Sequence, residues 1–216
     1  MLAALVNAWR VPDLRKKILY SAFLLFVYRL GAFIPAPGVD MAKVAEVFQA
    51  VMGETGGGLL GLVDMFSGGS IQRLSVFAVN VGSYITASIV IELLTVVIPS
   101  LEELSKEGPE GRRKISQYTR YLAVALAVLQ SYGYSAMFRE AIRPGAVWTL
   151  LGIGRMTAGA SFVIWLGEKI SEKGIGNGIS LIIFAGIVTQ LPGNVKNVIS
   201  LVKSGGTGWV FAIVYV

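Results

Sequence analysis

Few side chains in this chain of 216 residues are suited to chemistry, and those that are stand apart from one another. The sequence contains no histidine and no cysteine. It therefore lacks imidazole acids and bases, Ser-His and Cys-His nucleophiles, disulfides, and imidazole or thiolate metal ligands. Asp64 and Glu92 lie in or beside apolar stretches, but they are isolated carboxylates rather than a pair. We predict no enzyme, no metal site and no cofactor, and we find no acidic cluster of the kind that ion-coupled transporters use.

The run Gly174-Ile-Gly-Asn-Gly178 has the glycine density of a phosphate-binding loop. However, it follows a helical segment rather than a strand, and it lacks the lysine and the serine or threonine that end such loops. The alternative is a tight turn that reverses the chain between two helices, where glycine permits a positive φ. We predict the turn.

A basic run and a single arginine within an apolar stretch each have more than one interpretation. The run Gly111-Arg-Arg-Lys114 suits anionic lipid headgroups or RNA phosphates, although Glu102, Glu103 and Glu107 beside it weaken a purely positive surface. We favour the lipid and topology interpretation. Arg29 lies inside an apolar run, where a central arginine costs roughly 2.5–3.5 kcal/mol on insertion scales. An arginine near a helix end can extend to the membrane interface, and the sequence leaves this open for Arg29.

Long apolar segments dominate the rest of the chain. The composition is 54% hydrophobic and 15% charged, with the charges gathered between apolar runs, as in helical membrane proteins. A bilayer core of about 30 Å needs about 20 helical residues. We predict an all-α membrane protein, a polytopic helix bundle with a cytoplasmic amphipathic lead at 1–17. The five predicted spans are residues 18–34, 74–98, 118–138, 146–166 and 175–191.

A sixth apolar run begins near Trp209 and reaches Val216, so we predict the start of a further span at 208–216. The sequence thus has the pattern of the front part of a longer protein. Lys and Arg number eleven on the side of the N-terminus and seven on the opposite side, which places the N-terminus in the cytoplasm. Residues 99–117 are then a cytoplasmic loop, 168–178 a cytoplasmic turn and 192–207 an external hinge loop.

A short apolar segment bounded by glycines precedes the second span. Residues 59–69 are far too few to cross a bilayer core at about 1.5 Å per helical residue. Backbone that enters a membrane and breaks there is tolerated only where protein or a watery cavity satisfies its polar groups. The segment therefore predicts a pore or a binding cavity.

Longer motifs add a specific resemblance. They are Asp64-Met-Phe-Ser-Gly-Gly-Ser70, Tyr84-Ile-Thr-Ala-Ser-Ile-Val-Ile-Glu-Leu-Leu94, Glu107-Gly-Pro-Glu-Gly-Arg-Arg-Lys-Ile-Ser-Gln-Tyr-Thr-Arg-Tyr121, and Trp165-Leu-Gly-Glu168 followed by Gly174-Ile-Gly-Asn-Gly-Ile-Ser180. In order and spacing, from about residue 10 to residue 195, they resemble the bacterial SecY family, the channel subunits of the protein-translocation complex. The resemblance implies the N-terminal half of a ten-span channel with a re-entrant plug half-helix, in the bacterial cytoplasmic (inner) membrane.

The resemblance also implies roles for individual residues. In the family a half-helix after the first span is the plug, which closes the outer funnel of the resting channel and maps here to 59–70. The plug residues are Leu59, Leu60, Leu62, Val63, Met65, Phe66, Ser67, Gly68 and Gly69. The family's constriction, a ring of aliphatic side chains, maps to Val81, Ile85, Ile183 and Ile187.

Each pair of ring residues is spaced i, i+4 and so shares a helix face. Periodicity alone favours ordinary core or lipid-facing aliphatics at these positions. The chain departs from the family at Asn80-Val-Gly-Ser-Tyr84, where a Gly-Ile-Met-Pro-Tyr pattern is frequent. The proline is missing and a valine occupies the first ring position, so the assignment of Val81 and any proline-linked bend are in question.

The implied function is a non-enzymatic, protein-conducting channel that passes secretory polypeptides across the membrane and releases hydrophobic segments into it. The implied partners are SecE-like and SecG-like membrane subunits, a SecA motor or a ribosome, signal peptides and nascent secretory chains, the lipid bilayer and the second half of the same protein. The motor or ribosome would contact Lys106, Arg112, Arg113 and Lys114. The alternatives are a secondary transporter with broken helices and a structural membrane scaffold.

Overall fold

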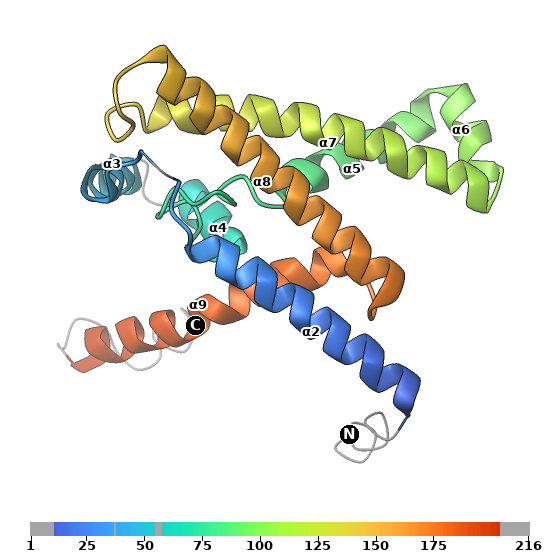
Figure 1. Ribbon diagram of the computed structural model, residues 1–216, viewed down its shortest axis with the longest axis horizontal. Helices are drawn as coiled ribbons and strands as arrows, with labels where there is room; N and C mark the ends of the chain where they lie inside the picture. The colour runs from blue at the N-terminus through green and yellow to red at the C-terminus, as the bar shows by residue number, and fades with distance from the viewer. Residues whose placement is uncertain (1–10, 37, 55–57, 204–216) are drawn as a thin grey trace.

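The computed structural model describes residues 11–36, 38–54 and 58–203, and this part of the chain is built from helices (Figure 1). In chain order they are α2 (Pro12–Phe33), α3 (Met41–Glu54), α4 (Gly58–Ser67), α5 (Gly82–Val97), α6 (Pro99–Lys106), α7 (Pro109–Met137), α8 (Ala146–Lys173) and α9 (Gly178–Lys203). Pairing of extended backbone among the described residues is limited to two isolated bridges. The predicted all-α class is confirmed.

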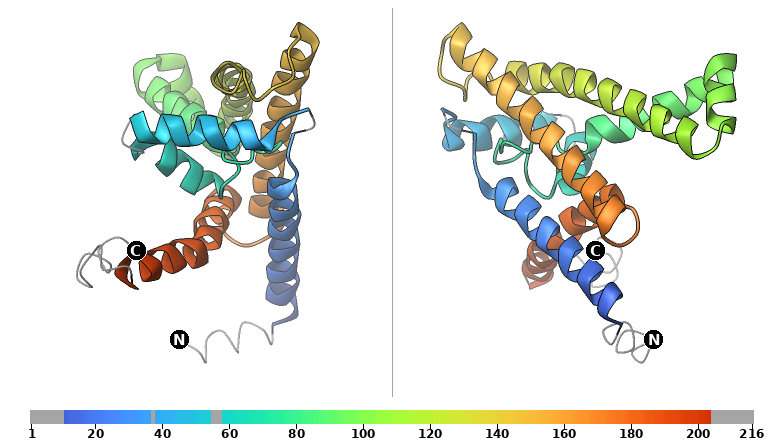
Figure 2. Two further views of the ribbon diagram at one scale, coloured as in Figure 1. Left: turned by 90° about the vertical axis from the view of Figure 1, so that its left-hand side faces the viewer. Right: turned by 45° about the vertical axis from the view of Figure 1, so that its right-hand side comes forward.

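Helix α8 is the central element of the bundle. It packs against α2, α7 and α9, while α5 packs on α7 and the short α4 packs on α9. Helices α2 and α8 pack side by side, and α3 runs crosswise to α2 (Figure 2). Helices α2, α7, α8 and α9 contain 22, 29, 28 and 26 residues. At about 1.5 Å per residue, each is long enough for a bilayer core of ~30 Å.

Length and hydropathy together give a smaller number of candidate spans than the five predicted. Among the described residues α8 alone qualifies, with a mean hydropathy of 1.4 in its best window. Helices α5 and α6 qualify only as a pair, and the chain bends by 102° between them. One or two such helices are weak evidence by themselves, because core helices of soluble proteins also meet these criteria.

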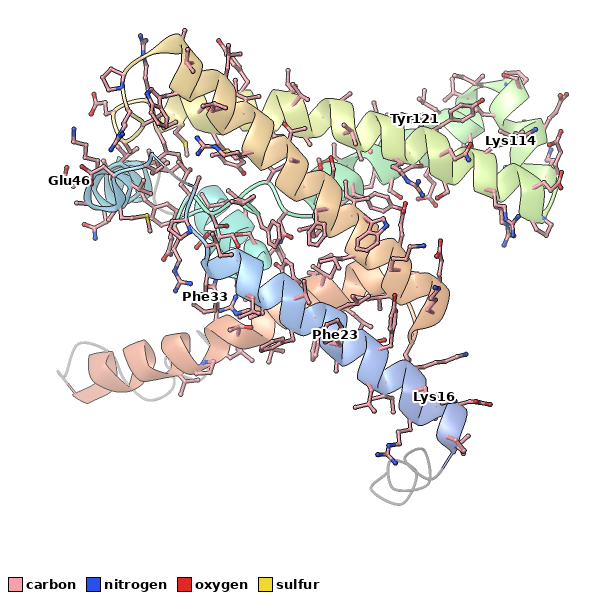
Figure 3. The ribbon with its side chains drawn as sticks, viewed as in Figure 1. Lys16, Phe23, Phe33, Glu46, Lys114 and Tyr121 are labelled. Carbon is pink, nitrogen blue, oxygen red and sulfur yellow. The ribbon has the colours of Figure 1, made fainter. Side chains whose placement is uncertain are left out.

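The outward faces of the helices supply a second kind of evidence. Large apolar side chains are more than half exposed on five elements, including Val96 on α5. Phe23 on α2 and Tyr121 on α7 are further examples and are labelled in Figure 3. Leu150 on α8 and Phe184 on α9 are also more than 60% exposed. Monomeric soluble proteins rarely expose apolar surface on so many elements, so these faces are suited to lipid or to further protein.

The second predicted span, 74–98, differs from the structure over its first third. Only the part within α5 is helical, and the chain from Gly68 to Val81 is irregular. Leu74 has φ +41° and Asn80 has φ +49°, and neither fits a right-handed helix. The backbone there bonds to the segment after α2 instead, with Ala36 N–H donating to Leu74 O at 3.2 Å. Tertiary hydrogen bonds thus replace helical ones in this apolar stretch.

Two predicted loops are largely helical. Most of 99–117 belongs to α6 and to the start of α7, and Pro99 and Pro109 stand at the first turns of these helices. Proline is favoured there because the first helical N–H groups have no intrahelical acceptor. In the described part of 192–207, α9 continues through Pro192 to Lys203. The predicted start of a sixth span, 208–216, and residues 1–10 of the predicted lead lie outside the described residues.

The chain reverses between α8 and α9 in a tight turn that is shorter than the predicted 168–178, because α8 runs to Lys173. Gly176 has φ +64°, a conformation open to glycine. Asn177 Oδ1 accepts the Ile179 N–H at 3.0 Å and so caps the start of α9. Gly178 N–H donates to Ser171 Oγ at 2.8 Å. These bonds hold the reversal between α8 and α9.

Candidate pore site

The short apolar segment forms α4, which has ten residues and packs on α9. It ends at Ser67 because Gly68 and Gly69 have φ +68° and φ +80°. Gly68 N–H donates to Met65 O at 3.2 Å and Gly69 N–H to Asp64 O at 3.0 Å, which is the pairing expected at a glycine-terminated helix. At about 1.5 Å per residue, α4 is roughly half as long as a bilayer core is thick.

Asp64 fixes the chain that follows α4. Its side chain is 1% exposed, and its Oδ1 accepts the N–H groups of Ile71 at 3.0 Å and Gln72 at 3.3 Å. The hydroxyl of Ser67 also donates to it, at 3.3 Å. A buried carboxylate with several donors is a structural anchor, since each bond offsets its loss of hydration. Asp64 therefore ties the end of α4 to the irregular segment.

A cavity of about 420 Å³ lies where α4 meets α5 and α9. Val63, Phe66 and Ser67 of α4 line one part of it, and Ile85, Thr86 and Ile183 line another. The remaining lining residues are Ala78, Val79, Asn80, Val81 and Gly82. The structure thus brings three plug residues and three of the four ring residues around one space whose lining is mostly aliphatic.

The four ring residues are not equivalent. Val81 is 2% exposed and also belongs to the core around Tyr28 and Phe77, whereas Ile85 is 37% exposed. Val81 is the residue before the first turn of α5, yet its carbonyl accepts the Ile85 N–H at 3.0 Å, so the i, i+4 spacing is helical. Ile187 is half-buried on α9 and does not line the cavity.

The plug residues divide in a similar way. Three plug residues do not line the cavity. They are Met65, which lies within α4, and Gly68 and Gly69, which follow its last residue. The side chains of Leu59, Leu60 and Leu62 fall outside the described set.

The departure from the family pattern at Asn80 has a structural counterpart. Its φ of +49° lies in the left-handed region, where glycine is at ease and asparagine is the best tolerated of the larger residues. Asparagine stands here at a position where the family frequently has glycine. It therefore allows the same left-handed backbone conformation and adds a side-chain amide. Gly82 begins α5 two residues later, and the stretch from Asn80 to Tyr84 contains no proline to shape this turn.

Three polar side chains at the end of α4 were not identified as site residues from the sequence. Arg29, Asn80 and Gln190 each donate to a carbonyl at this end, over 3.1, 3.4 and 3.0 Å. Arg29 carried a signal, a cation inside an apolar run. Asn80 carried only its departure from the family pattern, and Gln190 carried no signal, because polar residues near the ends of spans are ordinary.

The four basic residues assigned to a cytoplasmic partner lie at the end of α6 and the start of α7, and all are exposed. Lys106 pairs with Glu102 one turn earlier, and the Lys106 ammonium lowers the pKa of that carboxyl. Farther along α7, Arg120 binds Glu168 of α8 at 2.8 Å. Among the described residues no group of three or more carboxylates is placed to hold a metal ion.

Comparison with known proteins gives a consistent result. The SecY family model matches residues 75–216. The protein translocase subunit SecY of Corynebacterium glutamicum is 46% identical over 99% of this chain, and that of Mycobacterium tuberculosis (strain H37Rv) is 44% identical over 99%. In both cases the match covers 50% of the relative. The chain thus spans about half the length of the curated relatives it matches.

Solved structures share the fold. Sec61 in the canine ribosome-channel complex from the endoplasmic reticulum aligns with a TM-score of 0.65 and 17% identity, covering 90% of this chain and 43% of that one. A structure described as that of a protein conducting channel aligns with a TM-score of 0.64 and 16% identity, over 94% and 46%. Together with the family match and the identities of its relatives, this fold shows that the chain belongs to the SecY family.

Proposed function

We propose that this chain is the N-terminal half of a protein-conducting channel subunit, which passes secretory polypeptides across the cytoplasmic membrane and releases hydrophobic segments into it. One observation carries the proposal: a ten-residue half-helix, α4, lies against a cavity whose far side holds Val81, Ile85 and Ile183. A removable half-helix above an aliphatic constriction can seal a resting pore and still leave a path for a chain.

An aliphatic constriction suits a channel whose substrates share no side-chain chemistry. A narrow apolar ring excludes ions by dewetting, so it limits leakage without a charged gate. It also contacts any polypeptide through dispersion forces without preference for a particular residue type. Among the described residues, the cavity lining contains no carboxylate and no cation, so it does not favour a secondary transporter with a polar solute site.

The partners follow from the same proposal. SecE-like and SecG-like subunits and the second half of the protein would cover the exposed apolar faces of α2, α5 and α9. A SecA motor or a ribosome would bind the exposed basic end of α6 and α7, where Lys106, Arg112, Arg113 and Lys114 lie. Lys16 and Lys114 lie toward one end of the molecule and Glu46 toward the other, which supports a cytoplasmic N-terminus (Figure 3).

A photo-crosslinker at Ile85 in the full-length protein tests the channel directly. A nascent secretory chain that is stalled during export should form an adduct there, since Ile85 is partly exposed and lines the cavity. The matched control carries the crosslinker at Leu129 on α7, which is exposed but lies outside the cavity lining. Absence of an adduct at Ile85, or equal adducts at both positions, would contradict the proposal.

Polar substitution of the ring is expected to loosen substrate selection. Ile85→Ser with Ile183→Ser hydrates the constriction, so substrates with defective signal sequences should be exported several-fold faster than through the unmodified channel. The measurement is export of a reporter with a shortened apolar signal segment, and Leu129→Ser serves as the control. Unaltered export of that reporter would remove these two isoleucines from the proposed ring.

A further inference from the structure

The C-terminal end of α4 is bound by side chains from three separate parts of the chain. The last carbonyls of a helix have no intrahelical donor and need partners from elsewhere. Local groups serve some of them: Ser67 O accepts the Ser70 hydroxyl at 2.7 Å, and Met65 O accepts the Gly68 N–H. Residues that lie 14, 39 and 126 positions away in the sequence donate to Phe66 O, to Gly68 O just after α4, and to Asp64 O, which also accepts the Gly69 N–H and the Ser67 hydroxyl.

These distant donors are Arg29 of α2, Asn80 before α5 and Gln190 of α9. Arg29 Nη1 donates to Gly68 O at 3.1 Å, and Gln190 Nε2 donates to Asp64 O at 3.0 Å. Asn80 Nδ2 donates to Phe66 O over a longer 3.4 Å. The three bonds therefore connect α4 to the first, second and fifth predicted spans at once.

Close backbone packing makes this arrangement specific to one position of α4. Gly186 of α9 lies so near that a Cβ there would be 2.8 Å from Phe66 O. Arg29 is also held in place, because its guanidinium stacks 4.5 Å from the centre of the Phe33 ring. Arg73 stacks on the same ring at 4.6 Å but, among the described residues, donates no hydrogen bond to α4. The donors thus fit α4 only where it now lies.

We propose that Arg29, Asn80 and Gln190 form a polar latch that holds the plug in its closed position by capping the C-terminal carbonyls of α4. The inference rests on the proposed function of α4 as a plug. Displacement of α4, or separation of α2, α5 and α9 from one another, breaks these bonds, while the local bonds of Gly69 N–H and the Ser67 hydroxyl to Asp64 O move with α4 and are kept. The latch therefore couples the position of the plug to the spacing of the spans around it.

Removing a donor should favour the open channel. One hydrogen bond contributes about 1 kcal/mol net, which corresponds to about a fivefold change in the ratio of open to closed states. The variants are Arg29→Gln, Gln190→Leu and Asn80→Gly; the last keeps the positive φ while it removes the amide. Each should raise the resting ion conductance of the full-length complex in planar bilayers by about fivefold, and the triple variant should exceed all three.

Two control variants are matched to the latch. Thr189→Val removes the hydroxyl of the residue next to Gln190, which donates within α9 to Ala185 O. Arg73→Gln removes the other cation that stacks on the Phe33 ring. Both should conduct as the unmodified channel does. A third channel, lacking residues 59–70, should leak most, because it has no plug.

A second readout does not depend on conductance. These 216 residues contain no cysteine. In a full-length protein whose remaining cysteines, if any, are replaced by serine, Ala78→Cys, at a buried position in the cavity lining, reports plug displacement through labelling by an external thiol reagent. Labelling should be faster in each latch variant and unchanged in both controls. If the plug-deleted channel leaks while the latch variants match the unmodified channel in both readouts, the latch is wrong. If the plug-deleted channel does not leak, the proposed plug function itself fails.

Discussion

Replacing Asp64 with alanine is expected to destabilise the folded protein by roughly 2–4 kcal/mol, because it removes the acceptor of the buried Ile71 N–H and of the partly buried Gln72 N–H. The Asp64 carboxylate accepts the Ile71 and Gln72 N–H groups and the Ser67 hydroxyl, and it is 1% exposed. Water does not reach the Ile71 N–H to replace its lost bond, because that residue is fully buried. The measurement is thermal unfolding of the purified full-length complex, followed by tryptophan fluorescence.

A neighbouring aspartate provides the control for this substitution. Asp40 Oδ1 accepts the Ala42 N–H at 3.0 Å at the exposed start of α3. Loss of such a cap costs about 1 kcal/mol, so Asp40→Ala should lower the unfolding temperature much less. Asp64→Asn should fall between the two, since it keeps an acceptor oxygen but gives up the charge. Equal unfolding temperatures for Asp64→Ala and Asp40→Ala would show that the carboxylate is no anchor.

The half-helix and its boundaries were predictable because local chemistry determines them. A short apolar run followed by Gly68 and Gly69 indicates a helix that ends in two left-handed glycines, and the structure has both. The turn at Gly174–Gly178 was predictable for the same reason. The helical starts at Pro99 and Pro109 also carried a local signal, proline in a first turn, but the cluster of charges around them suggested a loop instead.

The irregular segment before α5 was not predictable from hydropathy. Apolar residues at Leu74 and Val76 suit a buried helix and a buried irregular chain equally well. Their conformation depends on hydrogen bonds with residues about 40 positions earlier: Val76 N–H donates to Ile34 O at 3.3 Å. The same limit applies to the latch, since Gln190 and Asp64 are 126 residues apart. The positions of the ring residues were predicted from the resemblance to the family. Aliphatic periodicity alone does not distinguish residues that line a pore from residues of an ordinary hydrophobic core.

Adding one methyl group at Gly159 is expected to displace this irregular segment. A Cβ at Gly159 would lie 2.0 Å from Val76 O and 2.8 Å from Val76 C, and neither backbone atom can rotate away as a side chain would. Overpacking of a tight contact costs about 1–3 kcal/mol, and backbone against backbone belongs at the upper end of that range. We therefore expect Gly159→Ala to lower the unfolding temperature of the full-length complex and to shift α8 relative to Val76.

Gly154 on the same helix provides a matched comparison, because a Cβ there meets no atom within 4 Å. Gly154→Ala should raise the stability by about 0.5–1 kcal/mol, since alanine loses less backbone freedom than glycine in a helix. The two substitutions add the same methyl group to α8 and are expected to act in opposite directions. Stabilisation by Gly159→Ala would disprove the close approach.

The contact between Gly159 and Val76 also matters for the pore, because Val76 lies two residues before Ala78, the first residue of this segment that lines the cavity. A shift there moves Asn80 and Val81, so Gly159→Ala should also speed labelling of a cysteine at Ala78, while Gly154→Ala should not.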